Sequence, residues 1–334
     1  MKTTIVITGL GVGGAERFLT KLLPLEGVDV VCITSRTHLG DLLSDMGVRV
    51  TYLNHKPFFL FRTMYRLYAH LRANRTSLLM TFLIHADIIG RFVGLFARVP
   101  VVCNIRNDYR KVTRLWLVDK FSRFLVRSYI VNSPALSGYM SALGVRSYEI
   151  IPNGVSLRRV RKKKVVSGKT IICVARLTAQ KDHATLLRSL TLLPSYTLLL
   201  VGTGALQESL RRLSQNLGIS DMVLFLGHRD DVAALVAGSD VFVLPSLTEG
   251  MSNALLEAMS VGAVCVVSDI AQNKALIKHK ENGLTFKVGN HRDLAKKIQL
   301  AKKEFGLNAK KDIKNNYDIK NVRKKYEKLF KSFF

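Results

Sequence analysis

Short runs of apolar, often β-branched residues alternate with amphipathic stretches along the first 132 residues. The apolar runs predict strands over 5–8, 28–34, 48–53, 78–82, 101–105 and 128–132. The stretches between them, with apolar residues at helical spacing, predict helices over 15–24, 39–46, 60–73, 85–96 and 114–126. Strands that alternate with helices indicate a parallel sheet covered by helices on both faces.

The same pattern restarts after residue 168, and it again predicts a parallel sheet. Strands are expected over 169–175, 196–201, 223–226, 241–244 and 264–268, and helices over 183–193, 205–217, 230–238, 253–260, about 291–305 and 319–334. The turn Pro152-Asn153-Gly154 and the basic run Arg158–Lys164 separate the two halves and indicate an exposed linker.

We therefore predict an α/β chain with two Rossmann-like, doubly wound parallel-sheet domains that face each other across a cleft. The first domain is expected over residues 1–155 and the second over 156–318, and the last helix, about 319–334, can pack back on the first domain. Clefts between α/β domains commonly bind ligands.

Composition places the chain among globular proteins without a membrane span. Its four cysteines, Cys32, Cys103, Cys173 and Cys265, lie far apart in apolar runs, and we expect buried free thiols in a reducing compartment. The N-terminal apolar run is too short for a signal peptide, and no run approaches the length that crosses a bilayer. We expect a cytoplasmic protein.

The net charge of +27 is concentrated in two segments. Residues 56–127 hold 14 Lys/Arg against 3 Asp/Glu together with many aromatic residues, and residues 274–334 hold 18 against 6. One interpretation is solvated faces in a basic proteome. The other is an anionic partner, which could be a membrane, a nucleic acid or a phosphorylated acceptor.

A glycine-rich loop, Gly9-Leu10-Gly11-Val12-Gly13-Gly14, follows the first strand and precedes a helix. Such a loop lets backbone N–H groups approach a phosphate at a helix N-terminus. A dinucleotide fold also needs an acid at the end of the second strand, where this chain has Thr34-Ser35-Arg36. The missing acid argues against NAD, although Arg36 could suit a 2′-phosphate.

Two further segments suggest a diphosphate site in the second half. Arg176 and Lys181 follow a strand and suit a diphosphate, although they could equally be surface cations. The segment from Pro245 to Met259 has an acidic turn at Glu249, a helix start near Ser252-Asn253 whose N–H groups can bind phosphate, and Glu257 one turn into that helix.

These motifs, in this order, resemble those of the family 4 retaining glycosyltransferases, which have the GT-B fold. The stretch Glu249–Glu257 is similar to their Glu-x7-Glu motif, and Arg176 and Lys181 are similar to their diphosphate-binding pair. Further resemblances lie at Gly13-Gly14-Ala15-Glu16-Arg17, Ile151-Pro152-Asn153-Gly154-Val155, Val201-Gly202-Thr203-Gly204 and Glu281-Asn282-Gly283-Leu284.

The resemblance implies a role for each matching residue. Glu257 would bind the ribose hydroxyls, Glu249 would face the donor sugar, and Arg176 and Lys181 would neutralise the leaving diphosphate. Backbone groups of Gly250, Met251, Ser252 and Asn253 would meet the sugar and β-phosphate, with Gly202, Thr203 and Gly204 near the nucleotide and with Gly13 and Gly14 approaching the phosphate from the first domain.

Less specific assignments concern three other positions. His85 matches a histidine that often faces the donor sugar, and its alternative is an ordinary residue at a helix start. The segment Asn104–Asn107 is a candidate for the acceptor side, and the turn Gly227-His228-Arg229 is a candidate for a place near the base.

One segment, Ser268-Asp269-Ile270-Ala271-Gln272-Asn273-Lys274-Ala275, departs from the family pattern. The family has a glycine and an acid there that this chain lacks, and we interpret the segment as an altered rim of the donor site.

The expected activity is retaining transfer of a hexose or N-acetylhexosamine from a UDP- or GDP-linked donor to a glycan or lipid-linked acceptor in envelope polysaccharide or lipopolysaccharide synthesis. No Asp-x-Asp motif and no metal-ligand spacing is present, so we expect no metal and no cofactor beyond the donor substrate. We also expect contact with the inner face of an anionic membrane and no nucleic-acid partner. The alternatives are a nucleotide-sugar 2-epimerase of the same fold and a basic nucleic-acid-binding protein.

Overall fold

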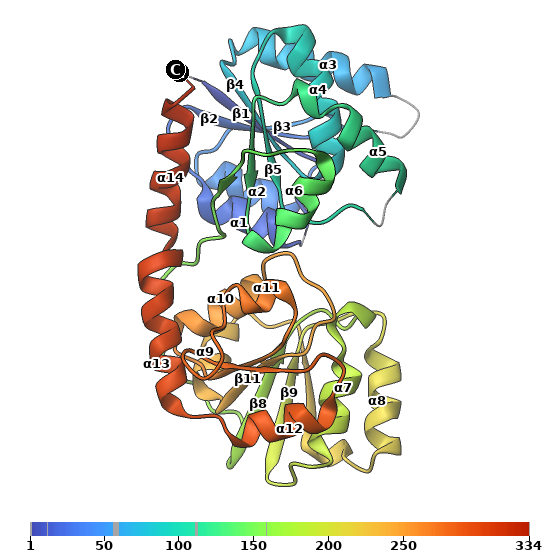
Figure 1. Ribbon diagram of the computed structural model, residues 1–334, viewed down its shortest axis with the longest axis vertical. Helices are drawn as coiled ribbons and strands as arrows, with labels where there is room; N and C mark the ends of the chain where they lie inside the picture. Colours follow the sequence, from blue (N-terminus) through green and yellow to red (C-terminus); the bar gives the residue numbers. More distant parts are fainter. Residues whose placement is uncertain (1, 12, 56–59, 111–112, 158, 334) are drawn as a thin grey trace. The chain divides into compact units, whose positions relative to one another are not determined.

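The structure is a computed structural model that describes residues 2–11, 13–55, 60–110, 113–157 and 159–333. Contacts within the chain divide it into two compact units, residues Met1–Gly154 with Ile319–Phe334, and residues Val155–Asp318. We call them unit 1 and unit 2 and describe each by itself (Figure 1). The sequence-based boundary between the first two domains lies at residues 155 and 156, one residue from the observed one.

Unit 1 contains a parallel sheet in the order β3-β2-β1-β4-β5-β6-β7. The strands are β1 (Thr3–Ile7), β2 (Val28–Cys32), β3 (Val50–Tyr52), β4 (Leu78–Phe82), β5 (Val101–Ile105), β6 (Ser128–Val131) and β7 (Glu149–Ile150). The helices are α1 (Gly14–Leu22), α2 (His38–Asp45), α3 (Leu60–Ala73), α4 (Ile84–Ala97), α5 (Thr113–Phe121), α6 (Ser137–Leu143) and α14 (Ile319–Lys331).

Alternate residues of the strands in unit 1 face two different helical layers. On β1, Ile5 and Ile7 belong to a core with α1, α2 and α14, whereas Val6 belongs to a core with α3, α4 and α6. Figure 1 shows α14 on one side of this sheet and α3, α4 and α5 on the other. The period-2 alternation of a strand that is apolar at every position therefore produces two cores, as in a sheet covered on both faces.

Helix α14 belongs to unit 1 although it is the last element of the chain. The Asn104 amide on β5 donates a hydrogen bond to the Tyr326 hydroxyl at 2.7 Å. The Arg323 guanidinium donates to the backbone oxygens of Lys21 and Leu23 at 2.7 and 2.9 Å, which are the carbonyls at the end of α1. Because Tyr326 is fully buried, the helix completes the core of this unit.

A buried ionic group lies under α4, α5 and α6. The Arg91 guanidinium lies 2.5 Å from a carboxylate oxygen of Asp119, and both side chains are fully buried. The Asp119 carboxylate also accepts a hydrogen bond from the Tyr139 hydroxyl. Nearby, burial raises the pKa of Asp87 to about 7, against the opposing effects of Arg91 and of a hydrogen bond from Thr81.

Unit 2 contains a second parallel sheet in the order β10-β9-β8-β11-β12-β13. Its strands are β8 (Lys169–Val174), β9 (Tyr196–Val201), β10 (Val223–Gly227), β11 (Val241–Leu244), β12 (Cys265–Ser268) and β13 (Leu284–Phe286). Its helices are α7 (His183–Leu190), α8 (Gln207–Asn216), α9 (Val232–Gly238), α10 (Asn253–Ser260), α11 (Ala271–Lys274), α12 (His291–Gln299) and α13 (Lys303–Asp312).

Two predicted helices differ from the observed ones. The helix expected over 114–126 ends at Phe121 and continues as a short 3₁₀ turn, Arg123–Leu125. The helix expected over about 291–305 ends at Gln299 as α12, the chain is extended at Lys302, with φ −123° and ψ 141°, and a separate helix, α13, then runs to Asp312, mostly beyond the predicted range. The sequence did not predict α6, α11, β7 and β13, which are too short to show a clear apolar period.

Candidate functional site

The candidate donor residues of unit 2 follow two strands that lie side by side at the centre of the sheet. From β8 the chain moves outward to β9 and β10, and it then returns to the other side of β8 as β11. Open α/β sheets bind ligands outside the carboxyl ends of the strands at such a reversal of strand order. Arg176 and Lys181 follow β8, and Glu249 follows β11, so topology places all three at this reversal.

The centre of this site is an ion pair between Lys181 and Glu249. The Lys181 ammonium donates to a carboxylate oxygen of Glu249, and the side chains are only 14% and 8% exposed. The Ser246 hydroxyl donates to the same oxygen at 2.7 Å. Arg176 is exposed on the same loop as Lys181. The site therefore presents one partly buried cation, already paired, and one exposed cation.

Backbone contacts hold the two loops together beside this pair. The Leu247 N–H donates to the Gln180 backbone oxygen at 2.9 Å, and the Gln180 side-chain amide donates to the Thr248 backbone oxygen at 2.8 Å. Because these bonds join a loop after β8 to a loop after β11, they fix the separation of Lys181 and Glu249. The sequence analysis did not identify Gln180 or Thr248.

Helix α10 begins directly after the acidic turn, as predicted. The Ser252 side chain caps it by accepting from the Leu255 N–H at 3.3 Å, and Asn253 is its first residue. The first N–H groups of a capped helix form a site of positive potential for an anion. Glu257, half-buried, lies one turn into the helix, and Gly250 and Met251 connect the turn to its start.

The glycines after β9 are required by close approach of two backbones. A Cβ atom on Gly202 would lie 2.1 Å from the Ala175 backbone oxygen, and its φ of +133° is unfavourable for any other residue. A Cβ atom on Gly204 would lie 2.4 Å from the Leu177 backbone oxygen. Between them the Thr203 backbone oxygen accepts from the Leu177 N–H at 3.0 Å. These residues bring the loop after β9 against the loop that carries Arg176.

The segment that departs from the family pattern is connected to Glu249 by hydrogen bonds. The Asn273 amide on α11 donates to the Ser268 hydroxyl at 3.0 Å, and that hydroxyl donates to the Ser246 backbone oxygen at 2.6 Å. Ser246 in turn contacts Glu249. Asn273, Ser268 and Ser246 are buried. Their hydrogen bonds therefore connect this segment, through the interior of unit 2, to the turn that carries Glu249. Sequence reasoning missed Ser246 and gave Asn273 no role.

The candidate residues of unit 1 lie at the corresponding reversal of its own sheet, between β1 and β4. Gly13 is the N-cap of α1 and Gly14 its first residue, and Val12 lies outside the described residues. His85 is exposed on the first turn of α4, after Leu83, whose φ of +75° is unusual for a residue other than glycine. A non-glycine residue held in such a conformation is more frequent at functional sites than elsewhere.

The predicted acceptor segment is largely internal. Asn104 and Arg106 are buried, and Arg106 lies 4.2 Å from the ring centroid of Phe18 and donates to the Asn153 side chain. Burial lowers the pKa of Arg106. Asn104 and Arg106 are therefore part of the interior of unit 1, and only Asn107 of this segment is exposed.

His183 is a second buried residue that sequence reasoning missed, and it begins α7 close to Lys181. Burial, together with the charge of Lys181, lowers the pKa of His183 to about 4. The imidazole is therefore neutral at physiological pH and does not add a charge to the site.

The turn after β10 also approaches the loop after β9, since the Gly202 N–H donates to the Gly227 backbone oxygen at 2.8 Å.

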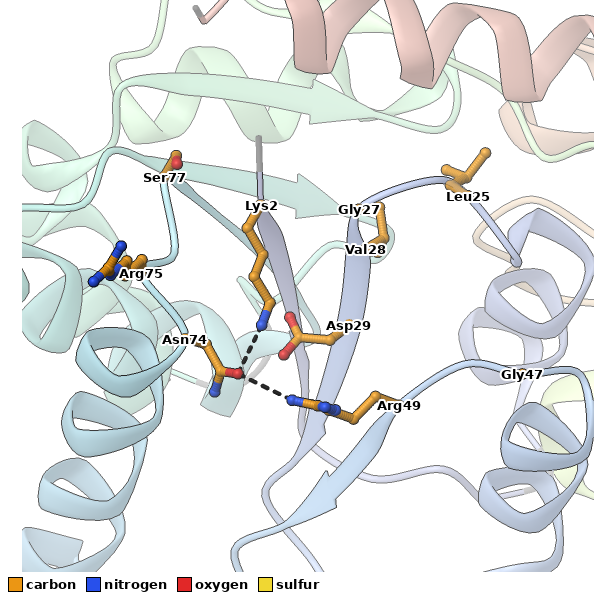
Figure 2. Close-up of a pocket in the computed structure, with 10 residues that line it drawn as sticks. All are labelled: Lys2, Leu25, Gly27, Val28, Asp29, Gly47, Arg49, Asn74, Arg75 and Ser77. Carbon is orange, nitrogen blue, oxygen red and sulfur yellow. Dashed lines mark hydrogen bonds between the residues drawn. The ribbon is translucent and has the colours of Figure 1, made fainter.

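A hollow of about 610 Å³ lies in unit 1, at the amino ends of its strands. Figure 2 shows Lys2 and Arg49 directed at the side-chain oxygen of Asn74, which accepts from them at 2.6 and 3.3 Å. The hollow is therefore at the opposite ends of the strands from Gly13 and His85, which follow the carboxyl ends of β1 and β4. We give it no role in the candidate site, because in this fold type the ligand binds at the carboxyl ends of the strands.

Other features agree with the sequence analysis within the described part of the chain. Cys32, Cys103, Cys173 and Cys265 are all buried free thiols, as predicted. No described helix combines the length and the apolar character that crossing a bilayer requires. Among the same residues, no three His, Cys, Asp or Glu side chains gather at metal-binding distance. Independence from metal stays a prediction.

Comparison with known proteins gives consistent matches over almost the whole chain. Residues 12–159 match the family model described as Glycosyltransferase Family 4, and residues 157–318 match the one described as Glycosyl transferases group 1. An uncharacterized glycosyltransferase of Methanocaldococcus jannaschii is 31% identical over 265 residues, which cover 74% of this chain and 68% of that protein.

Two further matches have more informative descriptions. A UDP-Gal:alpha-D-GlcNAc-diphosphoundecaprenol alpha-1,3-galactosyltransferase of Escherichia coli is 28% identical over 306 residues, which cover 81% of this chain and 79% of that protein. The crystal structure of Anabaena HepE in complex with UDP superimposes with a TM-score of 0.91 at 20% identity, and covers 99% of this chain and 100% of that one.

Proposed function

This chain is a glycosyltransferase that belongs to family 4 and has the GT-B fold, and we propose that it transfers a hexose or N-acetylhexosamine from a UDP- or GDP-linked donor to a lipid-linked glycan acceptor. The relatives are transferases, which agrees with the predicted activity and not with the epimerase alternative. The observation that carries the proposal is the Lys181–Glu249 pair beside Arg176, at the strand-order reversal of unit 2.

The proposed donor site has a cationic and an acidic part. Arg176 and Lys181 bind the diphosphate, because two cations on one loop match its two negatively charged groups. The capped start of α10 adds N–H groups from Gly250 to Asn253 for the β-phosphate and the sugar. Glu257 binds the ribose hydroxyls, and Gly202 to Gly204 lie beside the nucleotide.

Glycosyl transfer needs stabilisation of the negative charge that develops on the leaving diphosphate. In this proposal Arg176, Lys181 and the N-terminus of α10 supply it, since fixed charges and dipoles need no reorganisation during the reaction. Glu249 fixes the Lys181 ammonium before the donor arrives and faces the sugar. His85, Gly13 and Gly14 keep the roles that the family resemblance implies, and the transfer proceeds with retention and without a metal.

The proposed acceptor class follows from the description of a relative. The Escherichia coli relative is described as acting on a diphosphoundecaprenol-linked sugar, and this supports a polyprenyl-diphosphate glycan as acceptor in envelope glycan synthesis. Such an acceptor lies in a membrane, so the enzyme is expected at the inner face of the cell membrane. The net charge of +27 supports contact with an anionic surface there.

Isothermal titration calorimetry with UDP and GDP tests the donor site. The wild-type protein should bind one of the two, and Arg176→Ala and Glu257→Ala should each weaken that binding by at least about tenfold, as expected for loss of a hydrogen-bonded contact to a charged or buried group. Glu304→Gln, on the exposed side of α13, is the matched control and should bind normally. Normal binding by both site variants would refute the proposed site.

Transfer itself is tested with the nucleotide sugar that corresponds to the bound base. We expect the labelled sugar to appear on a polyprenyl-diphosphate-linked saccharide. If the labelled sugar is only hydrolysed or isomerised when that acceptor is present, the proposed acceptor class is wrong even though the donor site stands.

A further inference from the structure

Five aromatic side chains protrude from the helical layer formed by α3, α4 and α5 in unit 1. They are Phe61, Tyr65, Phe96, Phe121 and Phe124, which are 87%, 71%, 70%, 70% and 78% exposed. Apolar rings that are exposed to this degree on several neighbouring helices are unusual for a protein surface that contacts only water. We call these five residues the aromatic face.

The elements that carry the aromatic face pack next to one another. Helix α4 contacts both α3 and α5, as well as the 3₁₀ turn Arg123–Leu125. All three helices turn their inner residues toward the same core on one face of the sheet, as Leu67 on α3, Val93 on α4 and Trp116 on α5 illustrate. The three helices form a single layer over one face of the sheet (Figure 1), and their exposed residues are those that do not pack on its core.

Most of the exposed charged side chains of this layer are positive. Of the three acids between residues 60 and 127, Asp87 and Asp119 are fully buried, and Asp108 is bonded to Arg110. By contrast, Arg62 on α3, Arg114 on α5 and Arg123 on the 3₁₀ turn are all exposed on the elements that carry the aromatic residues. The fold therefore buries two of the three acids of this segment, and the exposed third, Asp108, is paired with Arg110.

We propose that the aromatic face is a membrane-docking surface that inserts its rings at the headgroup level of an anionic bilayer. The inference deepens the membrane contact proposed above and rests on it. Aromatic rings and long cationic side chains are suited to the interface between water and hydrocarbon, and the cations are attracted to anionic headgroups. A protein partner would have to offer an equally acidic and apolar surface.

Vesicle sedimentation tests the surface with the full chain. Wild-type protein should pellet with vesicles that contain phosphatidylglycerol, should pellet much less with phosphatidylcholine alone, and should be released by high salt. The double variants Arg114→Glu with Arg123→Glu and Phe121→Ser with Phe124→Ser should each lower the bound fraction by about tenfold or more.

Controls in unit 2 address the second basic segment. Lys303→Glu with Lys310→Glu reverses two exposed cations on α13, and Leu307→Ser removes a side chain there that is 69% exposed. These variants should pellet with anionic vesicles almost as the wild type does. Equal losses in the α13 variants and in the variants of the aromatic face would refute a specific surface.

The variant Phe124→Trp provides a direct readout, because this position is 78% exposed, and the wild type, whose Trp116 packs against the core, is the control. Nitroxide-labelled lipid in anionic vesicles should quench the fluorescence of this variant more than that of the wild type, and unlabelled vesicles should not. Pelleting without quenching would place the contact elsewhere and would refute the inference, as would self-association of the protein through Phe121 and Phe124 in the absence of lipid.

The donor site is tested separately on the same variants. Nucleotide binding at wild-type strength shows that a variant is folded and assigns a loss of pelleting to the surface. If the wild-type protein binds nucleotide but no anionic vesicle, the docking surface is refuted and the proposed donor site stands. If the wild-type protein binds anionic vesicles but no nucleotide, the proposed donor site is refuted and the docking surface stands.

Discussion

The variant Glu249→Gln distinguishes a carboxylate that holds a diphosphate-binding cation from one that only supports the loop. In the free protein Glu249 accepts from Lys181 and from Ser246, and the Lys181–Glu249 pair is largely shielded from solvent. Glutamine keeps the shape and one acceptor oxygen, but it removes the charge. If Lys181 binds the diphosphate, Glu249→Gln should increase the affinity for free nucleoside diphosphate while it lowers transfer.

The size of the effect follows from the geometry of the pair. A hydrogen bond to a charged group contributes about 1.5–3 kcal/mol, and a neutral one about 0.5–1.5 kcal/mol. The variant therefore loses about 1–2 kcal/mol of interaction with Lys181 in the free protein. A bound diphosphate restores a charged partner to Lys181 and no longer meets a carboxylate, so nucleotide affinity should rise by about 5–30-fold.

Calorimetry at moderate salt measures this change, with whichever of UDP and GDP the wild-type protein binds. Lys181→Met should weaken binding by at least about tenfold, because it removes the cation itself. Glu304→Gln should leave affinity unchanged. Unchanged or weaker nucleotide binding by Glu249→Gln would show that the pair does not restrain the cation that contacts the diphosphate, and the reasoning would fail.

Three further predictions concern stability and the shape of the site. Asp119→Asn should lower the unfolding free energy of unit 1 by about 3–5 kcal/mol, because it leaves Arg91 buried without a charged partner; urea titration followed by tryptophan fluorescence checks this, and a loss below about 1 kcal/mol would contradict it. The pKa of Asp87 is about 7 in the folded state and exceeds the ordinary value of 3.8, so the folded state binds a proton that the unfolded state releases. The free energy of unfolding should therefore fall as pH rises from about 4 to 7. Asp87→Asn should flatten this dependence in urea titrations at several pH values, and an unchanged slope would refute the assignment. Gly202→Ala should weaken nucleotide binding and lower the thermal midpoint, because its Cβ would lie 2.1 Å from a backbone oxygen at φ +133°. Gly138→Ala, in helix α6 with open space around it, should leave nucleotide binding unchanged and should not lower the thermal midpoint.

Strands were predictable because each is a compact run of apolar residues with polar residues on either side. The runs at 78–82 and 241–244 match β4 and β11 at both ends. Short elements could not be predicted in this way: β13 has three residues, and the break before α13 depends on one extended residue, Lys302, within a polar stretch.

The candidate site was predictable where a motif is continuous in sequence. The stretch from Glu249 to Glu257 forms the expected turn and capped helix, and Lys181 reaches the same turn. Ser246 and Asn273 could not be found, because their contacts join segments that only the order of the strands brings together. Arg106 is a polar residue at a strand end that looks exposed in sequence, but the core covers it with Phe18.

The return of α14 to unit 1 has a consequence for how the protein is made. Val155 and Asp318 are paired as neighbours, and the Val155 N–H donates to the Tyr317 backbone oxygen at 2.8 Å, so unit 2 starts and ends at one point and is complete within a single stretch. Unit 1 lacks Tyr326 and Phe330 until α14 has left the ribosome. During synthesis, the part of the enzyme that is encoded first can therefore mature only after the part that interrupts it.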